Sequence, residues 1–416
     1  MNFTRHSWRR GAALGIIGAL IGALAACGGD GDSASADDTI TLWQYYGDPD
    51  MPTGAPLYDL VERYEEESGT DVEVRFIPFD DFNRTLLQSA AGGDLPDVAL
   101  INAFDTAAMA EAGVIQDLGD RVEEWGEEDA YFETSWSTGQ FDGSTYGIPH
   151  LADAYALYYN KAMLDDAGLE PPQTWDEMAT AAETLSTTDG RTGLAVSGVE
   201  GAEGATGLII RLLAAGGAVE EIDSPAGVEA LEDFASMADS GAISPGFLTW
   251  IEDDVKNQFA QERAAMMINS ATYVSLLREE TPDLEWDVSL LPADETATTF
   301  LSAENLSIGA TSENADAAWD LIEFMQEPEE LETYLPERNK LPARDDVPGT
   351  AEDPIRAVFA EQLQEAWAPE GDVAATSGEI FTHVQRALQA TVSGTATAQE
   401  AAAQAQEAID EALGAE

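Results

Sequence analysis

The chain is poor in the side chains that enzymes use most often for catalysis and metal binding. Its only histidines are His6, His150 and His383, and its only cysteine is Cys27. It contains no H-E-x-x-H motif, no G-x-S-x-G motif and no glycine followed by lysine. Their absence argues against a zinc protease site, against a serine hydrolase whose nucleophile lies in a G-x-S-x-G turn, and against a P-loop. We therefore expect no enzyme, no cofactor and no bound metal. A carboxylate pair for glycoside hydrolysis stays open, because 80 acidic residues offer many pairs.

One stretch, residues 146–168, gathers aromatic side chains around a histidine. It reads YGIPHLADAYALYYNKAMLDDAG and holds four tyrosines besides His150. Tyr158 and Tyr159 are neighbours in an expected strand, so their side chains point to opposite faces and cannot bind one ferric ion together. We expect Tyr155, Tyr158 and Tyr159 to belong to a buried strand, and the following NKAMLDDAG to form a helix that stops at glycine.

The charge of the chain is strongly negative. Eighty acidic and 18 basic residues give a formal net charge of −62, and Lys161, Lys256 and Lys340 are the only lysines. Such a chain repels nucleic acid. Many carboxylates with almost no lysine favour a halophilic protein, because concentrated salt screens the repulsion between them. A hydrophobic fraction of 44% predicts a folded protein, and 416 residues are enough for two domains with their own cores.

The first 38 residues are expected to lie outside the fold. Residues 1–26 combine basic residues with a small apolar run, which predicts an export signal too short for a convincing membrane span. The run LAAC ends at Cys27 and resembles the bacterial lipobox, which implies a lipoprotein signal peptide and lipidation of Cys27; Arg9 and Arg10 leave Sec and twin-arginine export open. Residues 27–38 are small and polar and predict a flexible tether. We expect an extracytoplasmic protein anchored to the outer face of the cell membrane.

The remaining residues alternate between strand and helix patterns. Residues 39–47 form an apolar run closed by glycine, residues 55–69 carry an apolar helical stripe, and Thr174 with Glu177 has the spacing of a capping box. This order predicts an α/β fold with two lobes, each a mainly parallel sheet flanked by helices, and with crossing segments near residues 146–153 and 292–305. We place lobe 1 at residues 39–147 plus 297–345 and lobe 2 at residues 148–296 plus 346–416.

Five stretches resemble, in the same order, segments of a known family. They are ITLWQYYGD, AAGGDLPDVALINAF, YGIPHLADAYALYYNKAMLDDAGLEPPQTWDEM, FAQERAAMMINSATY, and LSAENLSIGATSENADAAWDLIEFM followed by NKLPAR. On these motifs the chain resembles extracellular solute-binding proteins of the maltose-binding type, the sugar receptors of ABC importers (solute-binding family 1). The resemblance implies a periplasmic-binding-protein-like fold whose lobes close on a di- or oligosaccharide in the cleft and deliver it to permease subunits in the membrane.

The resemblance also implies where the sugar binds. Aromatic faces cover the C–H patches of a sugar, while carboxylates and amides bind its hydroxyls. The family positions carried over to this chain are Tyr45, Tyr46, Asp48, Asn102, Asp105, His150, Asp153, Trp250, Tyr273, Glu304, Asn305 and Phe381. Among these, Asp153 is the expected hydroxyl acceptor at the first crossing. Thr272 stands where the family has a stacking tryptophan, which leaves open whether Tyr273 replaces it.

The sequence leaves further candidates and two alternatives open. Glu200 and Glu203 are further, weaker positions for ligand contacts, whereas Trp43 and Trp175 are expected in the core. A receptor of the same fold could take another small solute, a glycerol phosphodiester or a polyamine, although the scattered arginines indicate no anion site. The other alternative is a lipid-anchored glycosidase. We expect a monomer whose partners are a small-molecule sugar, the membrane and an ABC permease.

Overall fold

The strands form a mixed sheet that is parallel towards both of its ends. The computed structural model describes residues 39–187, 190–347 and 353–414. In this part of the chain the strand order is β2-β1-β3-β10-β6-β8-β7, with β11 beside β10 and β9 beside β6. β1 is parallel to β2 and β3, β7 is parallel to β8, and the central strands are antiparallel to their neighbours in this order. The strands are β1 (Thr39–Gln44), β2 (Asp71–Phe76), β3 (Val98–Asn102), β6 (Ile148–Asn160), β7 (Thr192–Ala195), β8 (Ala264–Ser270), β9 (Trp286–Ser289), β10 (Thr299–Ile308) and β11 (Ala366–Trp367), with a separate hairpin of β4 (Gln140–Phe141) and β5 (Ser144–Thr145).

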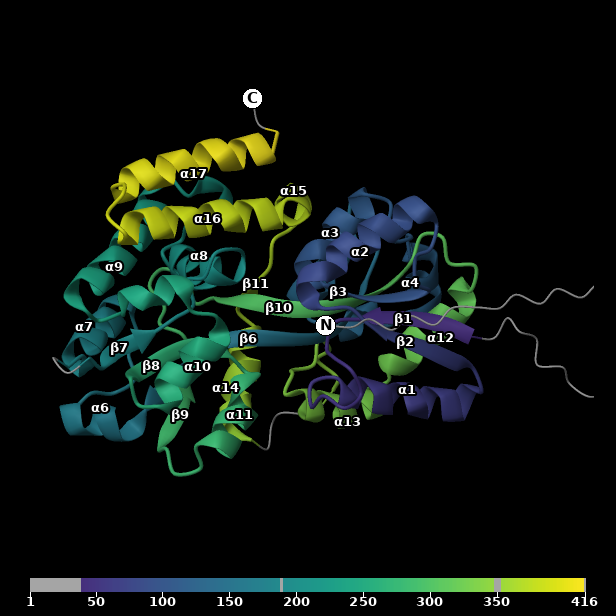
Figure 1. Ribbon diagram of the computed structural model, residues 1–416, viewed down its shortest axis with the longest axis horizontal. Coiled ribbons are helices and arrows are strands. Elements are labelled where there is room, and N and C mark those ends of the chain that lie inside the picture. Colours follow the sequence, from purple (N-terminus) through teal and green to yellow (C-terminus); the bar gives the residue numbers. More distant parts are fainter. Residues whose placement is uncertain (1–38, 188–189, 348–352, 415–416) are drawn as a thin grey trace, which may run out of the picture. The chain divides into compact units, whose positions relative to one another are not determined.

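Two long strands, β6 and β10, connect the two lobes. They pair antiparallel from Ile148 opposite Leu306 to Ala154 opposite Leu301. The other edge of β10 pairs with β3 in lobe 1, while the later residues of β6 pair with β8 and β9 in lobe 2. Figure 1 shows both strands running from one group of strands to the other. The crossings predicted at residues 146–153 and 292–305 each overlap one of these strands, and the predicted two-lobed α/β fold is confirmed.

The helices follow from local sequence. In α1 (Ala55–Ser68) the side chains of Leu57, Leu60 and Tyr64 are buried on one face, and Gly69 ends the helix in a left-handed conformation with φ of 77°. A β-branched or bulky residue would be strained at that φ, so glycine sets the end of α1. The apolar stripe predicted for this segment is therefore the face that packs on the sheet.

The helix α7 (Trp175–Leu185) begins at the predicted cap. The Oγ1 of Thr174 accepts a hydrogen bond from the backbone N–H of Glu177 at 3.2 Å. The carboxylate of Glu177 accepts from the N–H of Gln173 at 2.8 Å and so closes the turn one residue before the cap. Trp175 and Trp43 are 3% and 6% exposed, which confirms that both belong to the core.

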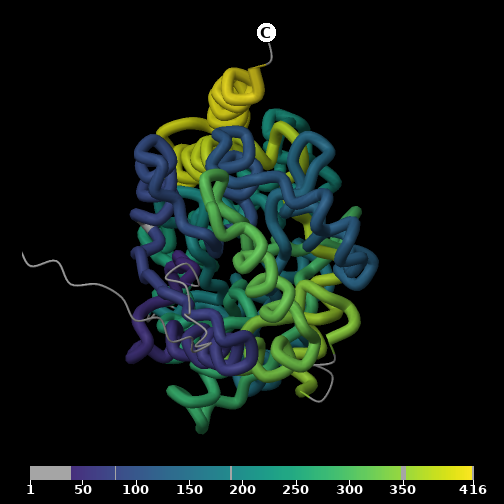
Figure 2. The backbone as a smooth tube through the Cα atoms, turned by 90° about the vertical axis from the view of Figure 1, so that its right-hand side faces the viewer, coloured from purple at the N-terminus to yellow at the C-terminus, as the bar shows by residue number. Residues whose placement is uncertain are grey.

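Helices cover the sheet in both lobes. α17 packs on α16 and α9, and Figure 2 shows the C-terminal part of the chain, in yellow, at the top of the molecule. None of the helices in the described residues is long and apolar enough to cross a membrane. Besides α1 and α7, the helices of the described residues include α2 (Phe79–Gly92), α3 (Ala103–Glu111), α4 (Gly119–Trp125), α5 (Glu133–Ser137), α6 (Lys161–Ala167), α8 (Thr206–Ala214), α9 (Pro225–Ser240) and α10 (Glu252–Ala260). They continue with α11 (Tyr273–Glu280), α12 (Ala315–Met325), α13 (Pro328–Arg338), α14 (Pro354–Leu363), α15 (Gly371–Ala375), α16 (Ser377–Val392) and α17 (Ala398–Ala412).

Two predictions about chain organisation are not tested by the structure and stay predictions. Cys27, the signal segment and the tether lie outside the described residues. Contacts join residues 39–416 in one compact unit, so the lobe boundaries drawn from the sequence stay a prediction.

Candidate ligand-binding site

The first group of predicted site residues gathers around Glu304 on β10. Tyr46 follows β1, and its hydroxyl donates to the Oε2 of Glu304 at 3.1 Å. Gln44, the buried last residue of β1, donates from its side-chain amide to the Gly47 carbonyl at 2.7 Å and so holds the turn after the strand. The rings of Tyr45 and Tyr46 lie 5.5 Å apart in an edge-to-face arrangement. The structure thus brings Tyr45, Tyr46 and Glu304 together.

Helix α13 adds two residues to this group that the sequence analysis did not name. The guanidinium of Arg338 lies 3.6 Å from the centroid of the Tyr46 ring, and its Nη1 donates to the carbonyl of Thr53. Tyr334 lies four residues earlier on the same helix face and is 1% exposed. We call the following five residues the crossover cluster: Tyr45, Tyr46, Glu304, Tyr334 and Arg338.

The crossover cluster contains donors without acceptors. Among the described residues, the hydroxyls of Tyr45 and Tyr334 and the Nε of Arg338 are buried with no hydrogen-bond partner. Burial raises the pKa of Tyr334, the charge of Arg338 lowers it and the charge of Glu304 raises it, and the net increase keeps the proton on the hydroxyl. Burial lowers the pKa of Arg338, but Tyr46, Tyr334 and Glu304 outweigh this and raise it overall. The cluster therefore presents unused donors beside one carboxylate.

An exposed aromatic ring borders the crossover cluster. Phe79, the first residue of α2, packs edge-on against Tyr45 with ring centroids 5.1 Å apart and is 56% exposed. Phe82 contacts Tyr45 from the same helix at 5.2 Å but is 2% exposed. Asp48, another predicted site residue, lies exposed in the loop after β1. Phe79 thus offers an open aromatic face that the sequence analysis did not identify.

The second group lies in lobe 2 around Glu252, the first residue of α10. The hydroxyl of Tyr155 donates to Glu252, and the Oε1 of Glu203 accepts from the backbone N–H of Glu252 at 2.7 Å. We call Glu203 and Glu252 the acid pair. Tyr155 was expected only as part of a buried strand, and the structure adds this polar contact; Tyr158 is fully buried and donates to the Ser270 carbonyl at 2.6 Å.

The acid pair has an unusual electrostatic environment. Burial raises the pKa of Glu252 to about 7, the hydrogen bond from Tyr155 lowers it, and the charge of Glu203 raises it. Tyr273, a predicted site residue, is 8% exposed, and burial followed by the charge of Glu252 raises its pKa. The charge of Glu252 therefore acts on Tyr273, and near neutral pH Glu252 exchanges its proton readily.

Asp153, the predicted hydroxyl acceptor, is fully buried and bonded to the protein. Its Oδ1 accepts from the N–H groups of Ala154 and Ala271, both at 2.9 Å. Its Oδ2 accepts from the Oγ1 of Thr272 at 2.8 Å and from the Nζ of Lys340 at 3.0 Å. Asp153 thus ties β6 to the segment after β8 and to the segment after α13. Thr272, which stands in the place of a stacking tryptophan, serves this link, and ligand binding by Asp153 stays a prediction.

Lys340 lies in electrostatic range of both groups. Burial lowers its pKa, but the charges of Asp153 and Glu304 outweigh burial and raise it overall. The charge of Lys340 in turn lowers the pKa of Glu252. Glu304 of the crossover cluster and Glu252 of the acid pair are therefore parts of one charged region at the crossing strands.

Three predicted site residues face the interior. Asn305 is fully buried because side chains alternate along β10, and its Nδ2 donates into lobe 1 to Thr106 at 2.9 Å. His150 is fully buried behind Tyr334, with ring centroids 4.9 Å apart, and burial lowers its pKa to about 3. Phe381 is 1% exposed and packs against the rings of Phe104 and Phe300. Their roles in binding stay predictions, and the contacts seen here are structural.

The remaining predicted residues lie at the starts of helices or in loops. Asn102 caps α3, with its Oδ1 accepting from the N–H of Phe104 at 3.1 Å. Asp105 lies in the first turn of α3, where burial raises its pKa and the side chain of Asn83 lowers it. Trp250 is partly buried two residues before Glu252. In the described part of the chain, no side-chain hydrogen bond joins these three residues to either group.

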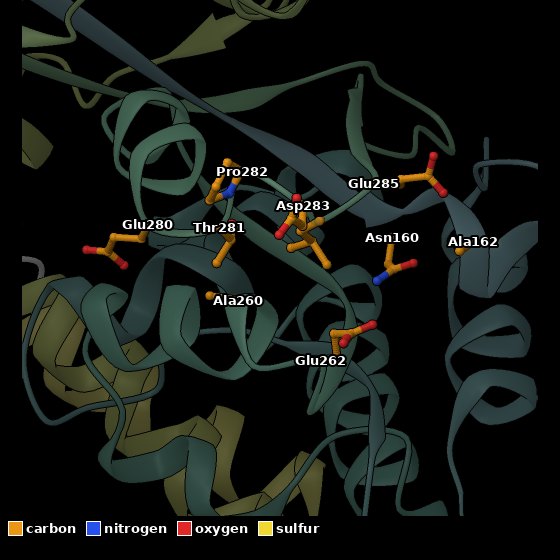
Figure 3. A pocket seen from close by; sticks show the side chains of 10 residues that line it. Asn160, Ala162, Ala260, Glu262, Glu280, Thr281, Pro282, Asp283 and Glu285 are labelled. Carbon is orange, nitrogen blue, oxygen red and sulfur yellow. The ribbon is translucent and has the colours of Figure 1, made fainter.

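A separate hollow lies away from the crossover cluster. Figure 3 shows its lining from the start of α6 and from the loops that follow α10 and α11, including Asn160, Glu262, Thr281 and Asp283. Its volume is about 350 Å³. It contains none of the predicted site residues and no aromatic ring, so we assign no function to it.

Comparison with protein families places the chain among binding proteins. The profile of the bacterial extracellular solute-binding proteins matches residues 48–332, more than half of the 416 residues. A protein of Brucella abortus (strain 2308) that is named only as a binding protein is 26% identical over 307 residues, which cover 70% of this chain and 73% of the relative. The galactooligosaccharide-binding protein of Bacillus subtilis (strain 168) is 22% identical over 406 residues and 92% of each chain.

Solved structures agree with this assignment. An ABC transporter solute-binding protein from Thermotoga lettingae, bound with alpha-D-tagatose, is 28% identical, with a TM-score of 0.80 over 91% of this chain and 100% of that chain. A maltose-bound protein of T. maritima has the same fold, with a TM-score of 0.79 at 21% identity over 90% of this chain and 99% of that chain. The chain therefore belongs to the family of bacterial extracellular solute-binding proteins.

Proposed function

We propose that this protein is the substrate-binding component of an ABC importer and that it captures a di- or oligosaccharide between its two lobes. The observation that carries the proposal is the crossover cluster, which sets unused donors of Tyr45, Tyr334 and Arg338 beside the carboxylate of Glu304. A sugar hydroxyl both donates and accepts, so it can satisfy both kinds of group at once. Phe79 and Tyr45 add aromatic surface for the C–H face of a sugar ring.

The names of relatives support a sugar as the ligand. Similar proteins include a diacetylchitobiose-binding protein of Streptomyces coelicolor, at 31% identity over 188 residues, and a multiple sugar-binding protein of Streptococcus mutans, at 22% over 340 residues. In our proposal the bound sugar closes lobe 1 (residues 39–147 plus 297–345) on lobe 2 (residues 148–296 plus 346–416), and the permease recognises the closed form. The protein binds as a monomer, and it does not cleave its ligand.

We further propose that lipidated Cys27 anchors the protein to the outer face of the membrane. The LAAC motif and the polar tether behind it support this placement. A lipid anchor with a short tether keeps the binding lobes beside the permease without a membrane-spanning helix.

The test is a melting screen in high salt with maltose, maltotetraose, diacetylchitobiose, a galactooligosaccharide and an arabinooligosaccharide. A sugar held at 100 times its Kd adds about 2.7 kcal/mol to the free energy of unfolding. We expect at least one sugar to raise the melting temperature and to be recovered intact after incubation. A melting shift produced by a polyamine or a glycerol phosphodiester but by no sugar would refute the choice of ligand, and hydrolysis of the sugar would refute the absence of catalysis.

A further inference from the structure

Within the described part of the chain, Arg338 combines two features, the lack of an ion pair and a buried nitrogen without a hydrogen-bond partner. Ten described cationic side chains have a carboxylate oxygen within 4.0 Å: Arg63, Arg84, Arg121, Lys161, Arg211, Lys256, Arg278, Lys340, Arg344 and Arg356. Arg338 has none among the described residues, although the chain carries 80 acidic residues. Of the described arginines, it alone combines this with a buried guanidinium nitrogen that has no hydrogen-bond partner.

The contacts of Arg338 hold the guanidinium in place but do not occupy all of its N–H donors. Its face lies over the Tyr46 ring, and its Nη1 donates to the Thr53 carbonyl. Asn339, in a left-handed conformation with φ of 55°, ends α13 directly after it. Asn339 is itself bound through its Oδ1 by Arg356 at 3.1 Å. A planar guanidinium fixed in this way presents its remaining N–H groups in a defined direction.

Tyr334 repeats the same feature one helical turn earlier. Its hydroxyl is buried and unpartnered among the described residues, and the side chain is 1% exposed. A buried donor without an acceptor costs free energy, so the protein keeps two such groups on one face of α13 at a net loss unless something outside the described chain accepts from them. Glu304 accepts from the hydroxyl of Tyr46, whose ring lies under the Arg338 guanidinium, and its charge raises the pKa of both Arg338 and Tyr334.

We propose that Arg338 and Tyr334 contact the ligand directly and, with Glu304, select an uncharged sugar residue that has two adjacent hydroxyls. This inference rests on the proposed function. One hydroxyl donates to Glu304, and the hydroxyl pair accepts from Arg338 and Tyr334. A sugar carboxylate would match Arg338 but would place a second negative charge beside Glu304 and near Glu252, so an acidic sugar binds less well than a neutral one.

The test uses the sugar from the panel above that raises the melting temperature of the full chain most. Titration calorimetry compares the wild type with Arg338→Met, Tyr334→Phe and the control Arg63→Met. Arg63 lies on α1 and joins it to α13 through an ion pair with Glu330 at 2.6 Å, so the control makes the same chemical change at another contact of α13. We expect Kd to rise roughly 10- to 100-fold in Arg338→Met and roughly 5- to 10-fold in Tyr334→Phe, and to stay within about 2-fold in the control.

Deoxy versions of the same sugar decide whether the contact is direct. We expect one monodeoxy sugar to bind the wild type weakly and to lose no further affinity with Arg338→Met, because the two changes remove one contact. Three outcomes would overturn the inference while the proposed function stands. They are unchanged affinity in both Arg338→Met and Tyr334→Phe, additive losses at every hydroxyl, and tighter binding of a glucuronate-containing disaccharide. If no panel sugar binds the wild type, both fall together. Should Arg338→Met fail to fold, Tyr334→Phe with the same deoxy sugars gives the decision.

Discussion

The raised pKa of Glu252 makes folding stability depend on pH in a direction that is unusual for a carboxylate. Burial and the charge of Glu203 raise this pKa from 4.5 to about 7. Below pH 4.5 both the folded and the unfolded chain carry the proton. Between pH 4.5 and 7 the folded chain keeps the proton that the unfolded chain loses, so the free energy of unfolding falls as pH rises. Above pH 7 the folded chain holds an ionised carboxylate in a poorly solvated position.

The size of the effect follows from the two pKa values. The difference between 4.5 and about 7 corresponds to roughly 3 kcal/mol at pH 8. Two features of the structure reduce this value. Glu252 keeps some exposure, and it lies in the first turn of α10, where the helix dipole favours a negative charge. We therefore expect Glu252→Gln, which stays neutral and can still accept from Tyr155, to raise the free energy of unfolding by about 1–2 kcal/mol at pH 8.

The assay is urea unfolding at constant high salt from pH 4.5 to 8.5. Glu66→Gln removes the same charge from an exposed position on α1 and corrects for the overall change in net charge. We expect Glu252→Gln to be close to this control at pH 4.5, to gain stability over it as pH rises from 4.5 to 7, and to keep a constant advantage above pH 7. A difference between the two variants that does not change with pH, or that favours Glu66→Gln at pH 8, would refute the account of Glu252.

Three further predictions test the other parts of the site. Asp153→Ala leaves the buried ammonium of Lys340 without its carboxylate and should lower the free energy of unfolding by about 3–5 kcal/mol; the double variant with Lys340→Met should recover part of the loss, and equal stability of both variants in urea would contradict the link. Phe79→Ala removes an exposed ring and should weaken binding of the panel sugar by roughly 5- to 10-fold in calorimetry without lowering the melting temperature, whereas unchanged affinity would place the ring outside the site. Cys27→Ala, expressed in the native host, should move the protein from the membrane fraction to the medium; retention in the membrane would disprove the lipid anchor.

The sequence predicted the architecture well because its signals are local. Apolar stripes, glycine stops and the Thr174 cap depend on residues within one or two turns, and the structure contains the corresponding elements. The sequence analysis identified Tyr46 and Glu304 because both lie at positions that the family resemblance marks, Tyr46 just after β1 and Glu304 on β10. Side chains alternate along β10, which explains why that of Asn305 faces the interior while that of Glu304 faces Tyr46.

The missed residues depend on contacts between distant segments. Arg338 and Tyr334 reach the crossover cluster from a helix that begins 20 residues after β10 ends, and no spacing connects them to Tyr46. Glu252 lies two residues after Trp250, yet among 80 acidic residues nothing in the sequence distinguishes it. Only burial and the hydrogen bond from Tyr155 reveal it. Local pattern therefore predicts which strands carry the site, whereas the chemistry of the site requires the folded structure.

The three lysines of the chain make the crossing strands open to chemical observation. The side chain of Lys161 is 50% exposed, that of Lys256 is 7% exposed, and that of Lys340 is 13% exposed against Asp153. Acylating reagents attack a neutral, accessible amine, and Lys340 is protonated and covered while it is bonded to Asp153. Its rate of acylation, read by mass spectrometry against Lys161 as an internal standard, therefore measures how often the segment after α13 separates from β6. Because the chain has only three lysines, acylation at Lys340 reports on the opening of this one link without interference from many other amines.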